Sequence, residues 1–135
     1  MPEVVTCLLE NNGKILILKR SNKVKTYKGL WGGVAGYIEQ DEDPFITSIK
    51  EIKEEVGLEK NEIKFIKKSE PIFFNDDYNG KKYHWIIHPF LYSVENKNKI
   101  KIDWENSEFK WINPSDIVNF NTVPHFKEIV NNFFK

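Results

Sequence analysis

The chain has 135 residues, with 20 basic and 20 acidic side chains and a formal net charge of zero at pH 7. This length suits one compact domain, so we expect residues 1–135 to form a single domain. The neutral balance argues against a long nucleic acid as the main partner, because affinity for its phosphates is built from excess Lys and Arg. Hydrophobic residues make up 40% of the sequence and aromatic residues 14%, which is enough for a core and for rings beside a ligand.

A single cysteine, Cys7, lies within an apolar run. One thiol excludes an intrachain disulfide and a cysteine-based metal site, so a buried core thiol is expected. The start of the chain lacks the basic region and long apolar run of a signal peptide. No stretch has the length and apolarity needed to cross a bilayer. We therefore expect a cytoplasmic protein with no membrane partner, and a homodimer is compatible with the sequence.

The first elements are predicted to be strands. Apolar runs at 4–9 and 15–18 are separated by Asn-Asn-Gly at 11–13, which predicts a β-hairpin. The polar segment 21–30 is predicted to be a loop. The glycine-rich segment 30–38 is predicted to be a strand interrupted by tight turns, because glycine permits backbone geometries that a side chain would block.

A helix is predicted over 44–56. Asp43 suits the N-cap and Pro44 the first helical position, while Gly57 suits the C-terminal end. Apolar residues recur at the three- and four-residue spacing of one helical face, namely at Phe45, Ile49, Ile52 and Val56.

The remaining elements are mostly strands, predicted at 63–66, 71–74, 83–94 and within 102–112. The polar segment 75–80 is predicted to turn between two of them, and 114–117 to form one helical turn. A last helix is predicted to open at 122–124 and to present one apolar face, composed of Phe126, Ile129, Val130, Phe133 and Phe134. This order predicts an α+β fold arranged as an α-β-α sandwich, a mixed β-sheet flanked by helices.

Three glutamates lie on a second face of the helix 44–56. Glu51, Glu54 and Glu55 are spaced i, i+3 and i+4, so their carboxylates can reach one ion. Three carboxylates held so close repel one another, and a hard divalent cation such as Mg²⁺ or Mn²⁺ would relieve that repulsion. On these residues alone, an ordinary solvated helix face is the competing interpretation.

The wider spacing resembles the signature of the Nudix hydrolases, Gly-x5-Glu-x7-Arg-Glu-U-x-Glu-Glu-x-Gly-U, in which U is aliphatic. In this chain Gly36 is followed after five residues by Glu42, and after seven more by Lys50-Glu51-Ile52-Lys53-Glu54-Glu55-Val56-Gly57-Leu58. Only the arginine differs, being replaced by Lys50. Trp31, five residues before Gly36, is also typical of the family. The resemblance covers residues 31–58 closely and the rest in coarse layout.

The resemblance implies a metal-dependent hydrolase of a diphosphate linkage in a nucleoside diphosphate derivative. The small nucleotide substrate would be a nucleoside triphosphate, ADP-ribose or a nucleotide sugar. Glu51, Glu54, Glu55 and the carbonyl of Ala35 would hold Mg²⁺, with Mn²⁺ as the alternative. Glu54 and Glu55 would be catalytic, with Glu55 or a nearby carboxylate taking the proton of the attacking water.

Two further carboxylates follow from the same resemblance. Glu42 would pair with Lys50, which lacks the bidentate fork of an arginine. Glu105 precedes Trp111-Ile112 in a loop-like stretch, together with Asn106 and Ser107, and would act as general base or extra metal ligand. A plain surface carboxylate is the alternative for Glu105.

Substrate contacts are expected from outside the signature. Arg20 ends the second predicted strand and would contact phosphate, with a solvated strand end as the alternative. Trp31 and Phe74 are predicted to stack on the base, and Tyr37 and Trp85 are further candidates. A core position is the alternative for each ring, because large rings are mostly buried.

Three other functions compete with hydrolysis. A catalytically inactive nucleotide-binding module of the same fold could dispense with Glu54 or Glu55, and both are present. An isoprenoid diphosphate isomerase would need a dedicated cysteine and further histidines, and Cys7 is in the wrong place for that role. A di-iron carboxylate protein would need paired Glu-x-x-His motifs on a four-helix bundle, which this strand-rich sequence lacks.

Overall fold

The computed structural model describes residues 2–134. Strands β1 (Glu3–Asn11) and β2 (Lys14–Arg20) form the first predicted hairpin. Its turn places Asn12 at φ 50° and Gly13 at φ 82°. A two-residue hairpin turn requires this left-handed backbone, and Asn-Gly adopts it at little cost.

The sheet is mixed. Its main path runs β3-β2-β1-β7-β5, with β4 paired to β1, β6 to β7 and β8 to β2. β1 and β7 are parallel, and the other strand pairs are antiparallel. The remaining strands are β3 (Trp31–Gly32), β4 (Val34–Tyr37), β5 (Ile63–Lys68), β6 (Ile72–Tyr78), β7 (Lys81–Val94) and β8 (Asn106–Ile112).

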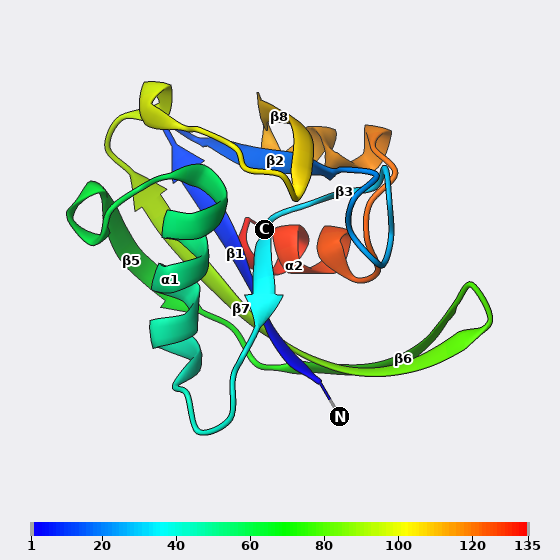
Figure 1. Cartoon of the computed structure of the whole chain (residues 1–135). Helices are drawn as coiled ribbons and strands as arrows, with labels where there is room; N and C mark the ends of the chain where they lie inside the picture. Colours follow the sequence, from blue (N-terminus) through cyan, green and yellow to red (C-terminus); the bar gives the residue numbers. More distant parts are fainter. Residues whose placement is uncertain (1, 135) are drawn as a thin grey trace.

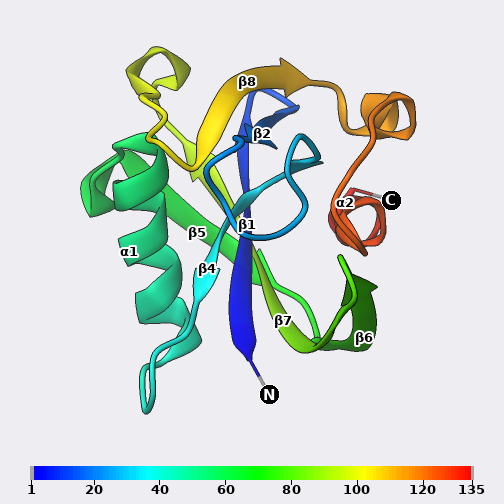
Figure 2. The same ribbon diagram turned by 45° about the vertical axis from the view of Figure 1, so that its right-hand side comes forward.

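Helices cover both faces of this sheet (Figure 1 and Figure 2). On β2, Leu16 and Leu18 belong to the core cluster that includes Ile52 of α1 (Pro44–Val56). Ile15 and Ile17 belong to the cluster that includes Ile129 of α2 (Phe126–Phe133). Because successive side chains of a strand point to opposite faces, one strand supplies both cores, and the α-β-α sandwich is confirmed. Three short 3-10 helices complete the fold: η1 (Lys60–Glu62), η2 (Lys97–Lys99) and η3 (Pro114–Asn119).

Helix α1 has the predicted bounds. The Asp43 side chain accepts a hydrogen bond from Phe45 N at 2.8 Å. Gly57 ends the helix at φ 74°, and its N–H donates to Lys53 O. Ile52 and Val56 are fully buried, which fixes the face that packs on the sheet.

Three sequence predictions were wrong in detail. Segment 75–80 was predicted to be a turn, but β6 continues to Tyr78 because it pairs with β7 along its whole length. Asn106 and Ser107 likewise belong to β8 rather than to a loop, since Asn106 pairs with Arg20. The last helix begins at Phe126, not at 122–124.

Backbone hydrogen bonds explain the late start of α2. Trp31 N donates to Asn121 O, and Val123 N donates to Trp31 O, so this segment pairs with β3 instead of coiling. Pro124 also disfavours a helical conformation at the preceding residue. Within residues 2–134, the structure contains no helix with the length and apolarity of a membrane span.

Candidate functional site

The carboxylates of Glu51, Glu55 and Glu105 converge in space. Each offers an oxygen atom, and the three atoms lie within 4.8 Å of one another. Glu51 and Glu55 come from successive turns of α1, whereas Glu105 lies immediately before β8. Glu54 lies outside this cluster but lines the same pocket as Glu51 and Glu105. The structure thus brings together the four carboxylates singled out in the sequence.

Glu55 is fixed from two sides. Only 2% of the residue is exposed. Its Oε2 accepts a hydrogen bond from Ala35 N at 3.2 Å, and its Oε1 accepts one from Asn106 Nδ2 at 3.4 Å. β4 and β8 therefore orient a carboxylate that α1 delivers.

Gly36 allows α1 to approach β4 closely. A Cβ atom at this position would overlap the carboxyl group of Glu51. The first glycine of the signature is therefore required, because the carboxyl group of Glu51 occupies the space that a side chain at position 36 would need.

Crowding and burial make these carboxylates harder to ionise. Burial, followed by repulsion from Glu54, raises the pKa of Glu51 from 4.5 to about 7. Burial and the charges of Glu105 and Glu51 raise the pKa of Glu55 well above its ordinary value. The pKa of Glu105 is also raised, first by burial and then by Asp103.

These residues fit a divalent cation. Three carboxylate oxygens within 4.8 Å form an all-oxygen donor set, which is the set that hard cations prefer. A bound cation would also favour the charged form of each group, against the burial that now opposes it. The cluster can therefore bind a metal.

An ion pair stabilises the loop before α1. Lys50 Nζ lies 2.8 Å from Glu42 Oε2, and Thr47 Oγ1 donates to Glu42 Oε1 at 2.5 Å. Hydrogen bonds from Lys50 and then Thr47 lower the pKa of Glu42. The predicted pairing of Glu42 with Lys50 is confirmed, so lysine takes the place of the family's arginine as a single-point partner.

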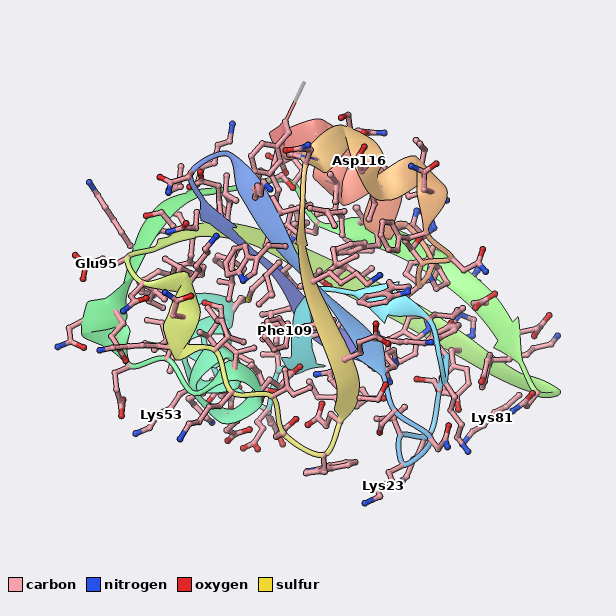
Figure 3. All side chains as sticks on the ribbon, turned by 90° about the horizontal axis from the view of Figure 1, so that it is seen from above. Lys23, Lys53, Lys81, Glu95, Phe109 and Asp116 are labelled. Carbon is pink, nitrogen blue, oxygen red and sulfur yellow. The ribbon has the colours of Figure 1, made fainter. Side chains whose placement is uncertain are left out.

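The carboxylates open into a pocket of about 690 Å³, a volume typical of sites for small molecules. The pocket is also lined by Lys23 and Lys25, from the loop between β2 and β3. Their positive charges complement the negative charges of Glu51 and Glu54. Figure 3 shows Lys23 on this loop, and the yellow segment that leads into β8 runs between the loop and α1. One pocket thus combines a cluster of carboxylates with flanking cations.

Arg20 lines the same pocket. Its Nε donates to Thr26 O at 2.9 Å, which holds the guanidinium at the end of β2. Burial lowers the pKa of Arg20, while the nearby charges of Glu55 and Glu105 oppose that effect. A guanidinium held in place beside this carboxylate cluster is suited to phosphate oxygens.

The predicted stacking residues are placed differently from one another. Phe74 lines the pocket, with its ring 4.4 Å from that of His125. Trp31 is buried in the core on the α2 side, 5.5 Å from the ring of Phe120, and is absent from the pocket lining. Trp31 is therefore a core residue, which was the alternative to stacking on the base.

Other residues were not identified from the sequence. Asn106 is buried and orients Glu55, and Trp104 is an exposed pocket residue next to Glu105. Ser21 contacts the segment that carries both. Cys7 is buried in the core, where burial raises the pKa of its thiol, so it does not supply the reactive cysteine of an isomerase.

Comparisons with known proteins agree with this geometry. The sequence model of the NUDIX domain matches residues 1–133. Nucleoside triphosphatase NudI of Escherichia coli O139:H28 is 26% identical to the chain, over 87% of this chain and 85% of the relative. NudI of Shigella flexneri matches to the same extent.

Solved structures share the fold. The MutT protein from Methanosarcina mazei Go1 superposes with a TM-score of 0.75 at 24% identity, covering 98% of this chain and 91% of that one. The E. coli dihydroneopterin triphosphate pyrophosphohydrolase superposes with a TM-score of 0.81 at 15% identity, covering 97% and 93%. The chain belongs to the NUDIX family, and it is a Nudix pyrophosphohydrolase that acts on phosphorus anhydrides.

Proposed function

We propose that this chain hydrolyses the diphosphate linkage of a nucleoside triphosphate in the presence of Mg²⁺. The observation that carries the proposal is the cluster of Glu51, Glu55 and Glu105, of which Glu51 and Glu105 line a pocket together with Arg20. The similarity to nucleoside triphosphatases named NudI supports this substrate class over ADP-ribose and nucleotide sugars. We also propose that residues 1–135 act as a single domain.

The carboxylates are proposed to have two roles, metal binding and proton acceptance. Glu51, Glu55 and Glu105 would hold Mg²⁺, assisted by the carbonyl of Ala35, which lines the pocket. When bound, the ion would neutralise phosphate oxygens and lower the pKa of the attacking water. Glu54 is exposed in the same pocket and outside the cluster, so it is the carboxylate left to accept the proton of that water.

Cations and rings are proposed to position the substrate. Arg20 is held by Thr26 and would contact a phosphate of the nucleotide. Phe74 would lie along the apolar wall on which the nucleoside rests. These groups act by binding and orientation, which is how much of the catalysis of phosphoryl transfer arises.

A panel assay tests the proposal. Purified protein with Mg²⁺ is incubated with nucleoside triphosphates, ADP-ribose, nucleotide sugars and dinucleoside polyphosphates. We expect the highest kcat/KM for a nucleoside triphosphate and loss of activity in excess chelator. A higher kcat/KM for ADP-ribose, a nucleotide sugar or a dinucleoside polyphosphate would refute the proposed substrate class.

Two variants separate the proposed roles. Glu55→Gln should weaken Mg²⁺ binding measured by calorimetry, because it removes a buried ligand. Glu54→Gln should lower kcat with Mg²⁺ affinity largely retained, because it removes the base. Unchanged rates in both variants would refute the assignment of the site.

A further inference from the structure

The pocket is lined by five aromatic residues, Tyr27, Tyr37, Phe74, Trp85 and Trp104. Most of their rings already pack against another ring of the protein. The ring of Tyr27 lies 4.8 Å from that of Tyr78, and its hydroxyl donates to Asp76. Phe74 is in contact with His125. Each of these two rings therefore already has a packing partner within the protein.

Two tyrosine rings pack against Trp85. Its ring stacks at 5.3 Å on Tyr83, with an interplanar angle of 13°, and at 6.0 Å on Tyr37, with an angle of 28°. Only 7% of Trp85 is exposed. So small an exposed fraction leaves little of the ring for a base, so Trp85 forms part of the pocket wall.

Trp104 has the opposite environment. It is 59% exposed, as is Tyr37. Of the large hydrophobic residues that are exposed within residues 2–134, only these two line the pocket. Tyr37 already gives one face to Trp85. Within residues 2–134, no aromatic ring or cation is stacked on Trp104.

The backbone that carries Trp104 is held in place. Ser21 Oγ donates to Trp104 O at 2.7 Å, and Ser21 N donates to Glu105 O at 2.8 Å. Glu105 N in turn donates to Asp103 Oδ1 at 3.1 Å. With the backbone held, only the two side-chain torsions of Trp104 remain to be ordered when its ring binds a ligand.

We propose that Trp104 stacks on the base of the nucleotide whose phosphates lie at Glu51 and Glu105, and so selects substrates that carry an aromatic base. The inference rests on the proposed function and adds a specificity-determining residue to it. Trp104 is the sequence neighbour of Glu105, and both line the one pocket. Base and phosphates of a single nucleotide could therefore meet the ring and the carboxylates together.

The test compares binding of adenosine 5′-monophosphate and ribose 5-phosphate by calorimetry in Mg²⁺. The two probes share a phosphorylated ribose and differ by the base. We expect the wild type to prefer the nucleotide, and Trp104→Leu to reduce that preference by roughly 5- to 100-fold, the usual worth of one base–aromatic stack. Trp104→Phe should keep most of the preference, because it keeps a ring.

Phe73→Leu is the matched control, since Phe73 is 68% exposed and lies outside the pocket lining. It should leave the preference unchanged. Equal loss of both probes in Trp104→Leu, or an equal preference in Trp104→Leu and the wild type, would overturn the inference. A wild type that prefers the nucleotide through Trp104 but hydrolyses no triphosphate would refute the proposed function alone and leave the stacking role standing.

Discussion

Because the carboxylates are crowded, we expect Glu51→Gln to change the stability of the metal-free protein. This substitution keeps the size of the side chain and removes its charge. Raising the pKa of Glu51 from 4.5 to about 7 corresponds to roughly 3 kcal/mol, at 1.36 kcal/mol per unit. The group is only partly buried, so solvent screening reduces this to about 1–2 kcal/mol. Metal-free Glu51→Gln should therefore be more stable than the metal-free wild type at pH 8 by that amount, or about 4–8 °C in Tm.

The gain should depend on pH. The carboxyl of Glu51 is easier to protonate in the folded chain than in the unfolded one, so it favours folding below about pH 4.5. This contribution is lost as the pH rises through about 7. Glutamine stays neutral throughout, so the difference between variant and wild type should be small at pH 4.5 and grow up to pH 8.

Thermal unfolding in chelator from pH 4.5 to 8 measures this difference. Mg²⁺ should then reverse the order at pH 8, because binding to the folded state stabilises the wild type, by about 2.7 kcal/mol at one hundred times Kd, and the variant less. The same variant should lose activity. A metal-free variant that is less stable than the wild type at pH 8, or a difference that does not change with pH, would refute the reasoning.

Substitutions at four other positions test the remaining geometry. Gly36→Ala forces the Glu51 carboxylate to move, so kcat should fall by about 100-fold with the circular dichroism spectrum retained; wild-type kinetics would contradict the close approach. Ser21→Ala removes the hydrogen bond to Trp104 O, so kcat/KM should fall by about 5-fold at roughly 1 kcal/mol for one such bond, with Ser21→Thr as the variant expected to retain it. Lys50→Arg should leave activity and Tm close to wild type while Lys50→Ala lowers both, because Glu42 keeps a partner only in the first. Ile52→Ala empties a fully buried site between α1 and the sheet, and urea unfolding should show a loss of about 2–5 kcal/mol.

Local patterns in the sequence determined helix α1 and its direction. The N-cap at Asp43, the stop at Gly57 and the apolar positions at Ile52 and Val56 all act within a few residues of one another. Their spacing also brought Glu51 and Glu55 onto a common face. For that reason the helix, its glutamate face and the family signature could all be predicted without a structure.

Contacts between distant residues could not be predicted in this way. The same apolar spacing did not show that 121–123 would pair with β3 and delay α2, nor that polar residues 75–78 would extend β6. Both outcomes depend on a partner strand that is remote in the sequence. Cross-strand hydrogen bonds outweighed the local turn and helix preferences there.

The site shows the same division. The sequence by itself determined which carboxylates α1 carries, and the family signature predicted that they would hold a divalent cation. Only the tertiary structure decided that Glu105, rather than Glu54, completes the group within 4.8 Å. It also placed Trp31 in the core and left Trp104 exposed in the pocket. The physical reason is that burial depends on what packs against a residue, and in this fold those neighbours come from strands and loops far along the chain.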